Sequence, residues 1–287
     1  MNSGRGRIRR GWALAKQSWA VLRADRSLAL FPVIAGFAML AAALVIAGPG
    51  VVLIATDTAA PVAFVLWAIA IYALGFIGIY CNVALAAAAA KALDGHDTTL
   101  ADGFSVARER KGLIAKWAAV QLTVGVLLQL IESALERTPI GPIVSILISG
   151  LLNAAWTIAT FFVIPVLALE GLGPKDALAR SVGVVKERWG EGFVGSASIG
   201  GIIVLVGVLP SIAIGALGVA AAGSTPALGG VLIAIAVVGL VLAMLIGSTL
   251  NAIFRVALLR FATQNQVAAG FDRNALEHAF APKRGRR

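Results

Sequence analysis

Long apolar runs separated by short polar stretches make up most of this chain. The runs lie at about 28–53, 62–90, 113–131, 141–169, 192–222 and 228–254. Each has roughly the 20 residues that a helix needs to cross the hydrocarbon core of a bilayer. Backbone groups in hydrocarbon must bond within a helix or a closed barrel, and these runs lack the two-residue alternation of barrel strands. The pattern therefore predicts an all-α polytopic bundle of six transmembrane helices.

Basic residues are distributed unevenly between these runs. Of the 24 Lys and Arg residues, all but Arg137 fall before the first run, in or beside the second and fourth gaps, or after the last run. Cytoplasmic segments retain Lys and Arg, so this asymmetry predicts that both termini are cytoplasmic. An even number of spans leads independently to termini on the same side.

Composition narrows the class of protein further. The chain is 59% hydrophobic and 13% charged, which excludes an ordinary soluble domain. Its net charge of +10 faces the anionic lipids of the inner leaflet, so we expect membrane lipids rather than nucleic acid as partners. The single cysteine, Cys81, allows no internal disulfide. Abundant Ala, Gly and Val with few Tyr and Cys are typical of high-GC bacteria, which predicts a bacterial cytoplasmic (inner) membrane protein.

The chain divides by environment into three predicted parts. Residues 1–27 form a cytoplasmic interfacial helix, 28–262 the six-span transmembrane domain, and 263–287 a cytoplasmic basic tail. The spans form three outer hairpins with amphipathic cytoplasmic helices between them.

The interfacial helix carries the candidate contacts to anionic lipid. Trp12 and Trp19 recur at helical spacing on one face, while Arg9, Lys16 and Arg23 repeat every seven residues on another. An apolar, Trp-bearing stripe beside a basic stripe is typical of a helix lying in the headgroup region.

Three intramembrane asparagines indicate an internal threefold repeat. Asn82, Asn153 and Asn251 lie in the second span of each pair, and each has Gly or Ser four residues earlier. A second signature is a small and large pair at the start of each cytoplasmic helix, such as Gly103-Phe104 and Ala177-Leu178.

The asparagines are the main candidates for an intramembrane polar site. An amide in hydrocarbon needs a partner, so these residues serve either as contacts between helices or as a polar lining for a substrate or ion path. Gln121, Gln129 and Glu132 share a face of the third span and are open to the same two interpretations.

Local signals predict several further details. Thr99 and Asp102 have the spacing of a helix N-terminus, and Gly173-Pro174 opens a second cytoplasmic helix. Pro210 is expected to kink the fifth span, and the glycines of the last two spans to permit close helix contact.

One segment resembles a known motif. Ala177-Leu178-Ala179-Arg180-Ser181, followed by Val185-Lys186-Glu187-Arg188-Trp189, resembles the A-L-x-x-S…V-K-x-R-W pattern of a broad group of bacterial membrane proteins. That group includes the membrane domain fused to some glycerophosphodiester phosphodiesterases. Over its full length the chain is similar to a six-span actinobacterial membrane protein family of unknown function. The resemblance implies no catalytic residue, because the phosphodiesterase chemistry of those fusions belongs to a separate soluble domain.

The sequence favours a non-enzymatic function. It contains no H-E-x-x-H, no G-x-S-x-G and no P-loop, so we expect no catalytic, cofactor-binding or metal-binding residues. The favoured hypothesis is a membrane protein of envelope or lipid homeostasis that binds anionic lipid or partner proteins. The alternative is a small permease or lipid-translocating protein that uses the Asn, Gln and Glu faces.

Cysteine labelling tests the predicted topology. In a Cys81→Ser background, single cysteines at Thr58 and Thr225 should react in intact cells with an impermeant thiol reagent. Cysteines at Ser3 and Lys175 should react only after the cells are opened. Labelling of the second pair in intact cells would contradict cytoplasmic termini.

Overall fold

A computed structural model of the chain describes residues 15–136, 141–189, 200–267 and 271. Within these ranges every regular element is a helix. Six segments are long and apolar enough to cross a membrane: Arg26–Ala55, Ala60–Leu93, Lys111–Glu136, Ser145–Leu169, Gly200–Ala222 and Pro226–Gln264. The prediction of an all-α, six-span helix bundle is confirmed.

The chain forms two compact units. Unit 1 consists of Met1–Ala29, Ala89–Thr98 and Arg188–Arg287, and unit 2 of Leu30–Ala88 and Thr99–Glu187. This division follows internal contacts, whereas the predicted boundaries at residues 27 and 262 follow membrane environment. Those predicted boundaries stay a prediction.

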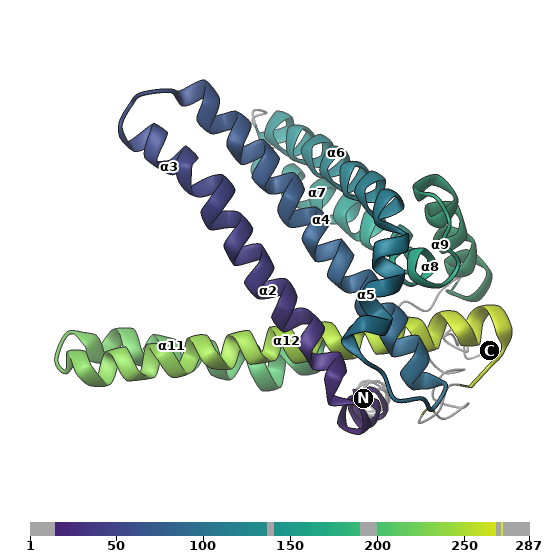
Figure 1. Cartoon of the computed structure of the whole chain (residues 1–287). Helices are drawn as coiled ribbons and strands as arrows, with labels where there is room; N and C mark the ends of the chain where they lie inside the picture. The colour runs from purple at the N-terminus through teal and green to yellow at the C-terminus, as the bar shows by residue number, and fades with distance from the viewer. Residues whose placement is uncertain (1–14, 137–140, 190–199, 268–270, 272–287) are drawn as a thin grey trace, which may run out of the picture. The chain divides into compact units, whose positions relative to one another are not determined.

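Unit 2 contains most of the first four spans and the helices that connect them (Figure 1). Its elements are α2 (Leu30–Ala42), the π-helix η2 (Ala43–Ala47), α3 (Gly48–Ala55), α4 (Ala60–Leu93, shared with unit 1), α5 (Leu100–Glu109), α6 (Lys111–Glu136), α7 (Gly141–Ala159), α8 (Val163–Leu169) and α9 (Pro174–Trp189). Helices α6 and α7 pack side by side.

The Gly103-Phe104 pair packs the short helix α5 against its neighbours. A Cβ atom on Gly103 would lie 2.5 Å from the Ala84 carbonyl oxygen and 2.6 Å from the Phe31 ring, so the position accepts only glycine. The Phe104 ring lies 5.2 Å from that of Phe31 and 6.0 Å from that of Tyr80. The small residue permits close approach, and the large one fills the space beside it.

Both predicted cytoplasmic helix starts are present. Thr99 and Asp102 form a reciprocal capping box at α5, and α9 begins at Pro174. Ser181 of α9 is fully buried, and its hydroxyl accepts a hydrogen bond from the Phe162 amide at 3.0 Å, at the N-terminus of α8. The serine of the A-L-x-x-S motif therefore caps a neighbouring helix.

An arginine caps the other end of α8. Arg110 Nη1 donates to the Leu167 carbonyl at 2.6 Å, as basic groups commonly do at helix C-termini. Gly171 follows with a φ of +64°, and a Cβ there would lie 2.6 Å from the Arg110 guanidinium. Backbone conformation and space both require glycine at this position.

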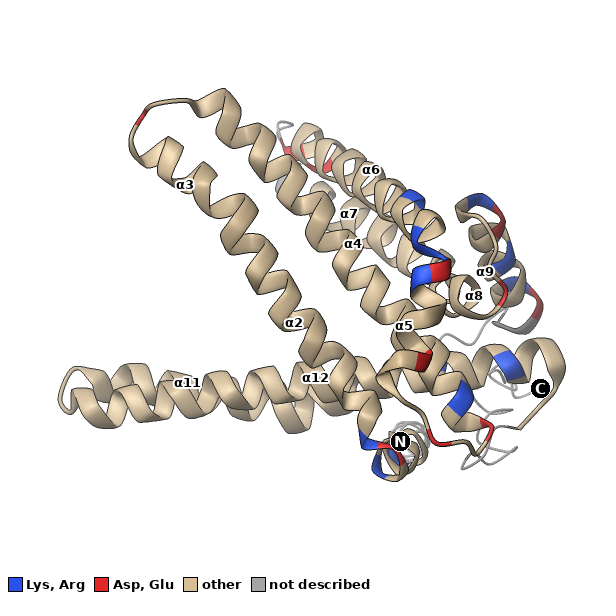
Figure 2. Ribbon diagram, viewed as in Figure 1, with Lys and Arg blue, Asp and Glu red and all other residues tan. Residues whose placement is uncertain are grey.

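Unit 1 is built around a helical hairpin. It contains helical residues 15–24, the 3₁₀ turn η1 (Arg26–Ala29), the end of α4, and helical residues 200–203, which continue into the π-helix η3 (Val204–Val208). Helices α11 (Leu209–Ala222) and α12 (Pro226–Gln264) then run side by side as an antiparallel pair (Figure 1). The sequence carries no charged residue from 192 to 254, and the paired part of the hairpin is tan in Figure 2, without blue or red.

Small residues bring the two helices of this hairpin together. A Cβ on Gly207 would lie 2.5 Å from the Ala243 methyl group, and one on Gly229 would lie 2.6 Å from the Ala222 backbone. A Cβ on Gly239 would lie 2.7 Å from the Ser211 hydroxyl. The interpretation as sites of close helix contact is confirmed for these three glycines, whereas a Cβ on Gly200, Gly201 or Gly230 would meet no such atom within 4 Å.

Proline changes the winding of two spans without ending them. Each π-helix ends two residues before a proline: η2 precedes Pro49, and η3 precedes Pro210. At the ends of these segments, Gly48 donates to the Ala43 carbonyl and Leu209 donates to the Val204 carbonyl. Proline donates no N–H and its ring crowds the preceding turn, which the wider π turn relieves. The helices continue to Ala55 and Ala222.

Asp25 joins the N-terminal segment of unit 1 to the loop after α4. Its Oδ1 accepts from the Ser27 amide at 3.0 Å and the Ser27 hydroxyl at 2.6 Å, and its Oδ2 accepts from the Thr98 amide at 3.0 Å and the Thr98 hydroxyl. Burial raises the pKa of Asp25, but these hydrogen bonds lower it by more, so the pKa lies below its ordinary value. In the same unit, Arg260 binds Asp94 with two hydrogen bonds of 2.5 and 3.0 Å.

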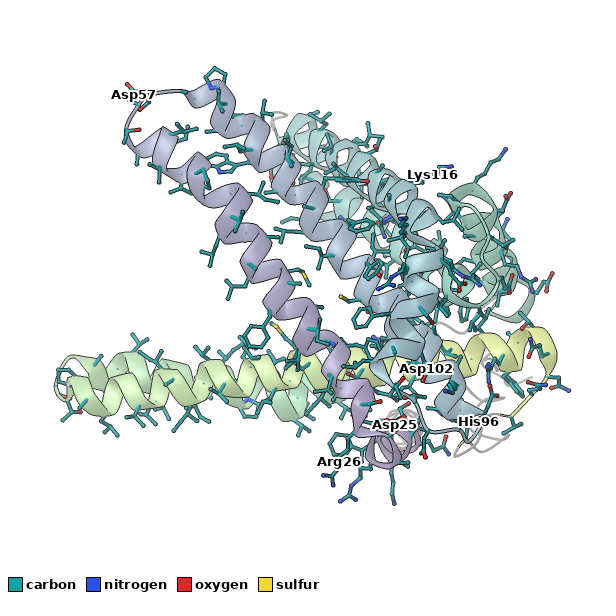
Figure 3. The ribbon with its side chains drawn as sticks, viewed as in Figure 1. Asp25, Arg26, Asp57, His96, Asp102 and Lys116 are labelled. Carbon is teal, nitrogen blue, oxygen red and sulfur yellow. The ribbon has the colours of Figure 1, made fainter. Side chains whose placement is uncertain are left out.

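Replacing this carboxylate should destabilise the protein. Asp25→Asn should lower stability in detergent by about 1–3 kcal/mol, the range for hydrogen bonds to a charged group. Asp57→Asn is the matched control, because Asp57 lies in the exposed turn between α3 and α4 with a φ of 51°, which asparagine tolerates (Figure 3). Thermal unfolding measures both, and equal losses would contradict the role of Asp25.

The lowered pKa also sets a pH dependence. The contribution of Asp25 is present in full above the ordinary aspartate pKa of about 3.9. It declines as the pH falls further, because the unfolded chain then binds the proton first. The stability difference between wild type and Asp25→Asn should therefore be constant near neutrality and shrink in strong acid.

Candidate functional site

The intramembrane asparagines mainly contact their own helices. Asn82 Nδ2 donates to the Gly78 carbonyl at 2.8 Å, and Asn153 Nδ2 donates to the Ser149 carbonyl at 2.8 Å. Both side chains are exposed. Asn251 is half-buried, and its Oδ1 accepts from Arg255 Nε at 3.1 Å, one turn further along α12. In two of the three predicted repeats, the small residue four positions earlier thus supplies the carbonyl that accepts a hydrogen bond from the asparagine.

One of the remaining polar candidates joins two helices. Gln121 Oε1 of α6 accepts from Trp156 Nε1 of α7 at 3.0 Å, and the Trp156 ring stacks on Trp117 with ring centres 6.0 Å apart. Gln129 is exposed and Glu132 is half-buried on the same helix. Asn251 belongs to unit 1 and the other five candidates to unit 2, so the use of these residues as one intramembrane polar site stays a prediction.

Helix 15–24 has an exposed face that is basic and aromatic. Lys16, Trp19 and Arg23 are exposed, whereas Val21 and Leu22 are buried. Positions three, four and seven apart share a face, so Trp19 lies beside the two basic residues, and the sequence interpretation that set it on a separate face is corrected. Trp12 and Arg9 lie outside the described residues.

An apolar cavity of about 720 Å³ lies within unit 1. Ala15, Lys16 and Trp19 line it from helix 15–24, and the remaining lining residues come from 202–214 and from α12 between Ile235 and Leu250. The volume lies within the roughly 300–1,000 Å³ that is common for small-molecule sites. Its described lining consists mainly of apolar side chains together with Lys16.

The position of Lys16 follows from the contacts of Asp25. Helix 15–24 leads directly to Asp25, which binds Thr98, and the same loop carries Asp94, bound to Arg260 of α12. The helix is therefore held toward the charged end of α12. Among the described residues that line the cavity, Lys16 carries the charge, and Ser211 has a polar hydroxyl group. The Ser211 hydroxyl already donates to the Gly207 carbonyl at 2.8 Å.

In the described part of the chain, no group of three or more His, Cys, Asp or Glu residues could hold a metal ion. The sequence contained partial signals for the cavity, namely Lys16, Trp19, Pro210 and the small residues of the last two spans. It did not show that all of them border one space, because that depends on the docking of helix 15–24 on the hairpin.

The contacts of the asparagines predict different consequences of their replacement. Asn251→Leu should lower stability in detergent by about 1–2 kcal/mol, because the Arg255 guanidinium loses this acceptor. Asn82→Leu and Asn153→Leu are the matched controls and should change stability by less than about 0.5 kcal/mol, as exposed residues bonded only within their helix. Thermal unfolding compares the three variants, and equal losses at all three positions would favour contacts between helices instead.

Comparison with known proteins identifies a family. Residues 61–271 match DUF6159, a family of unknown function. Comparisons with curated proteins and with solved structures found no match. The resemblance to an uncharacterised membrane protein family is supported in this coarser form, while that to the domain fused to glycerophosphodiester phosphodiesterases gains no support. Because the match extends over well more than half of its 287 residues, the chain belongs to the family DUF6159.

Proposed function

We propose that this protein is a non-enzymatic protein of the bacterial inner membrane that binds anionic lipids on the cytoplasmic side and acts in envelope or lipid homeostasis. One observation carries the proposal. In helix 15–24 the side chains of Val21 and Leu22 are buried, whereas those of Lys16, Trp19 and Arg23 are exposed. Basic side chains with an aromatic ring between them are suited to the boundary between headgroups and acyl chains.

The charge pattern supports a cytoplasmic location for this helix, next to anionic lipid headgroups. In the proposed topology, both termini and nearly all Lys and Arg residues lie on the cytoplasmic side. Each basic residue near an anionic surface contributes about 1 kcal/mol of attraction. Trp19 adds contact at the depth where its indole ring is half in water and half in hydrocarbon.

The proposal excludes catalysis on chemical grounds. A hydrolase or transferase needs an activated nucleophile, an acid–base pair or a bound metal, and the sequence has none of the usual motifs for these. The alternative of a small permease needs polar groups that face a shared path. The amides of Asn82 and Asn153 instead bind carbonyls of their own helices, so lipid binding is the better supported function.

Thermal unfolding of the full chain in a zwitterionic detergent tests the proposal. Phosphatidylglycerol should raise the midpoint more than phosphatidylcholine does, because a ligand that binds only the folded state stabilises it. The difference should shrink as salt is added, since ions screen surface charges within about 10 Å at 0.1 M ionic strength.

A double variant, Lys16→Gln with Arg23→Gln, should lose most of the preference for phosphatidylglycerol. Arg137→Gln is a matched control, because the charge pattern predicts that Arg137 lies on the outer side. Equal stabilisation of the wild type by both lipids would overturn the proposed function.

A further inference from the structure

The cavity of unit 1 is an elongated groove along the hairpin of α11 and α12. Its lining on α12 extends from Ile235 to Leu250, which at 1.5 Å per residue is about 22 Å, or most of the roughly 30 Å hydrocarbon core. A dry apolar cavity of about 150 Å³ admits benzene, and this groove has about 720 Å³. Its length and volume suit a long acyl chain.

Small residues make the floor of the groove. Gly207, Ser211, Gly239 and Ala243 lie at close contacts between the two spans, and all four line the cavity. Branched and long aliphatic side chains such as Ile214 and Ile246 form its walls. The π-helix η3 supplies Val206 and Gly207, so the proline-induced change of winding lies within the groove.

The groove is open along one side. Val206, Ile235 and Leu242 line it, and each is between 51% and 60% exposed. These side chains lie in a stretch without charged residues, which the proposed topology assigns to the hydrocarbon core of the bilayer. An acyl chain can therefore enter laterally from the bilayer, whereas a water-soluble ligand would have to cross hydrocarbon.

Lys16 and Trp19 define the headgroup end. Helix 15–24 is held toward the charged end of α12 by the contacts of Asp25 and Asp94. An ammonium group next to an apolar groove matches a phosphate next to an acyl chain, since lysine binds phosphate as a compact point charge. The uncharged hairpin offers no comparable partner farther along the groove.

We propose that this groove holds one acyl chain of an anionic phospholipid, with the lipid phosphate on Lys16. The inference rests on the proposed function and deepens it, because it replaces general attraction to a charged surface with one lipid at one site. It also separates two roles: the hairpin binds the acyl chain of the lipid, and Lys16 binds the negatively charged lipid phosphate.

Native mass spectrometry of the full chain with added phosphatidylglycerol tests the site. The wild type should retain one phosphatidylglycerol molecule. Leu242→Trp and Val206→Trp fill the groove from opposite helices and should each weaken this binding roughly tenfold. Val241→Trp and Leu205→Trp are the matched controls, since these neighbours are similarly exposed but do not line the groove, and they should bind as the wild type does.

Lys16→Gln should reduce binding of phosphatidylglycerol to the level of phosphatidylcholine while phosphatidylcholine binding is unchanged. Retention of phosphatidylglycerol by both groove variants at the level of their controls would overturn the acyl-chain site, even if the wild type prefers anionic lipid. Equal binding of both lipids to the wild type, lost in the groove variants, would instead overturn the proposed function and the role of Lys16 while supporting the acyl-chain site.

Discussion

The need to satisfy backbone hydrogen bonds without water determines how the spans are built. The described spans are helical, apart from a turn at residues 160–162 in the fourth, and Pro49 and Pro210 are accommodated by π turns rather than by breaks. Side chains follow the same constraint. Asn82, Asn153, Ser211 and Thr249 each donate to the carbonyl four residues earlier in their own helix. Polar groups that are paired in this way contribute little to helix association.

Close packing therefore has to hold the hairpin of unit 1 together. Lipid tails are as apolar as leucine, so burial of apolar side chains alone gives no drive for α11 to pair with α12. Glycine and alanine at the contact let the backbones approach and gain dispersion contacts along the whole pair. Because these residues are small, the groove forms between the larger side chains on either side of them. Groove and helix pairing thus have one physical origin.

The sequence predicted those features that depend on short stretches of chain. Run length sufficed for six spans, the Thr99 and Asp102 spacing for a helix cap, and several glycines of the last two spans for close contact. Pro210 was expected to kink its helix, and the structure has a π turn that ends two residues before it. The sequence did not determine the hydrogen-bond partners of the asparagines, because each side-chain amide had a carbonyl of its own helix within reach.

The candidate site was harder to predict because it joins distant segments. Lys16 and Leu250 line one cavity although 233 residues separate them, and no local pattern links them. The orientation of helix 15–24 was also ambiguous, since Trp19 lies near the boundary between its apolar and basic faces. The burial of Val21 and Leu22 determines the orientation of the helix. Burial of this kind is a property of the folded unit and not of the segment.

A basic N-terminal segment that only directs membrane topology has no need of a defined docking position. It requires positive charge near the first span, and a loosely attached segment would supply it equally well. Here four hydrogen bonds to Asp25 fix the end of helix 15–24, and a bidentate pair between Asp94 and Arg260 fixes the loop to which it is bound. Such contacts specify where Lys16 and Trp19 lie relative to the hairpin. A topology signal does not require such precise placement, and this is the physical basis on which we propose lipid recognition in addition to orientation.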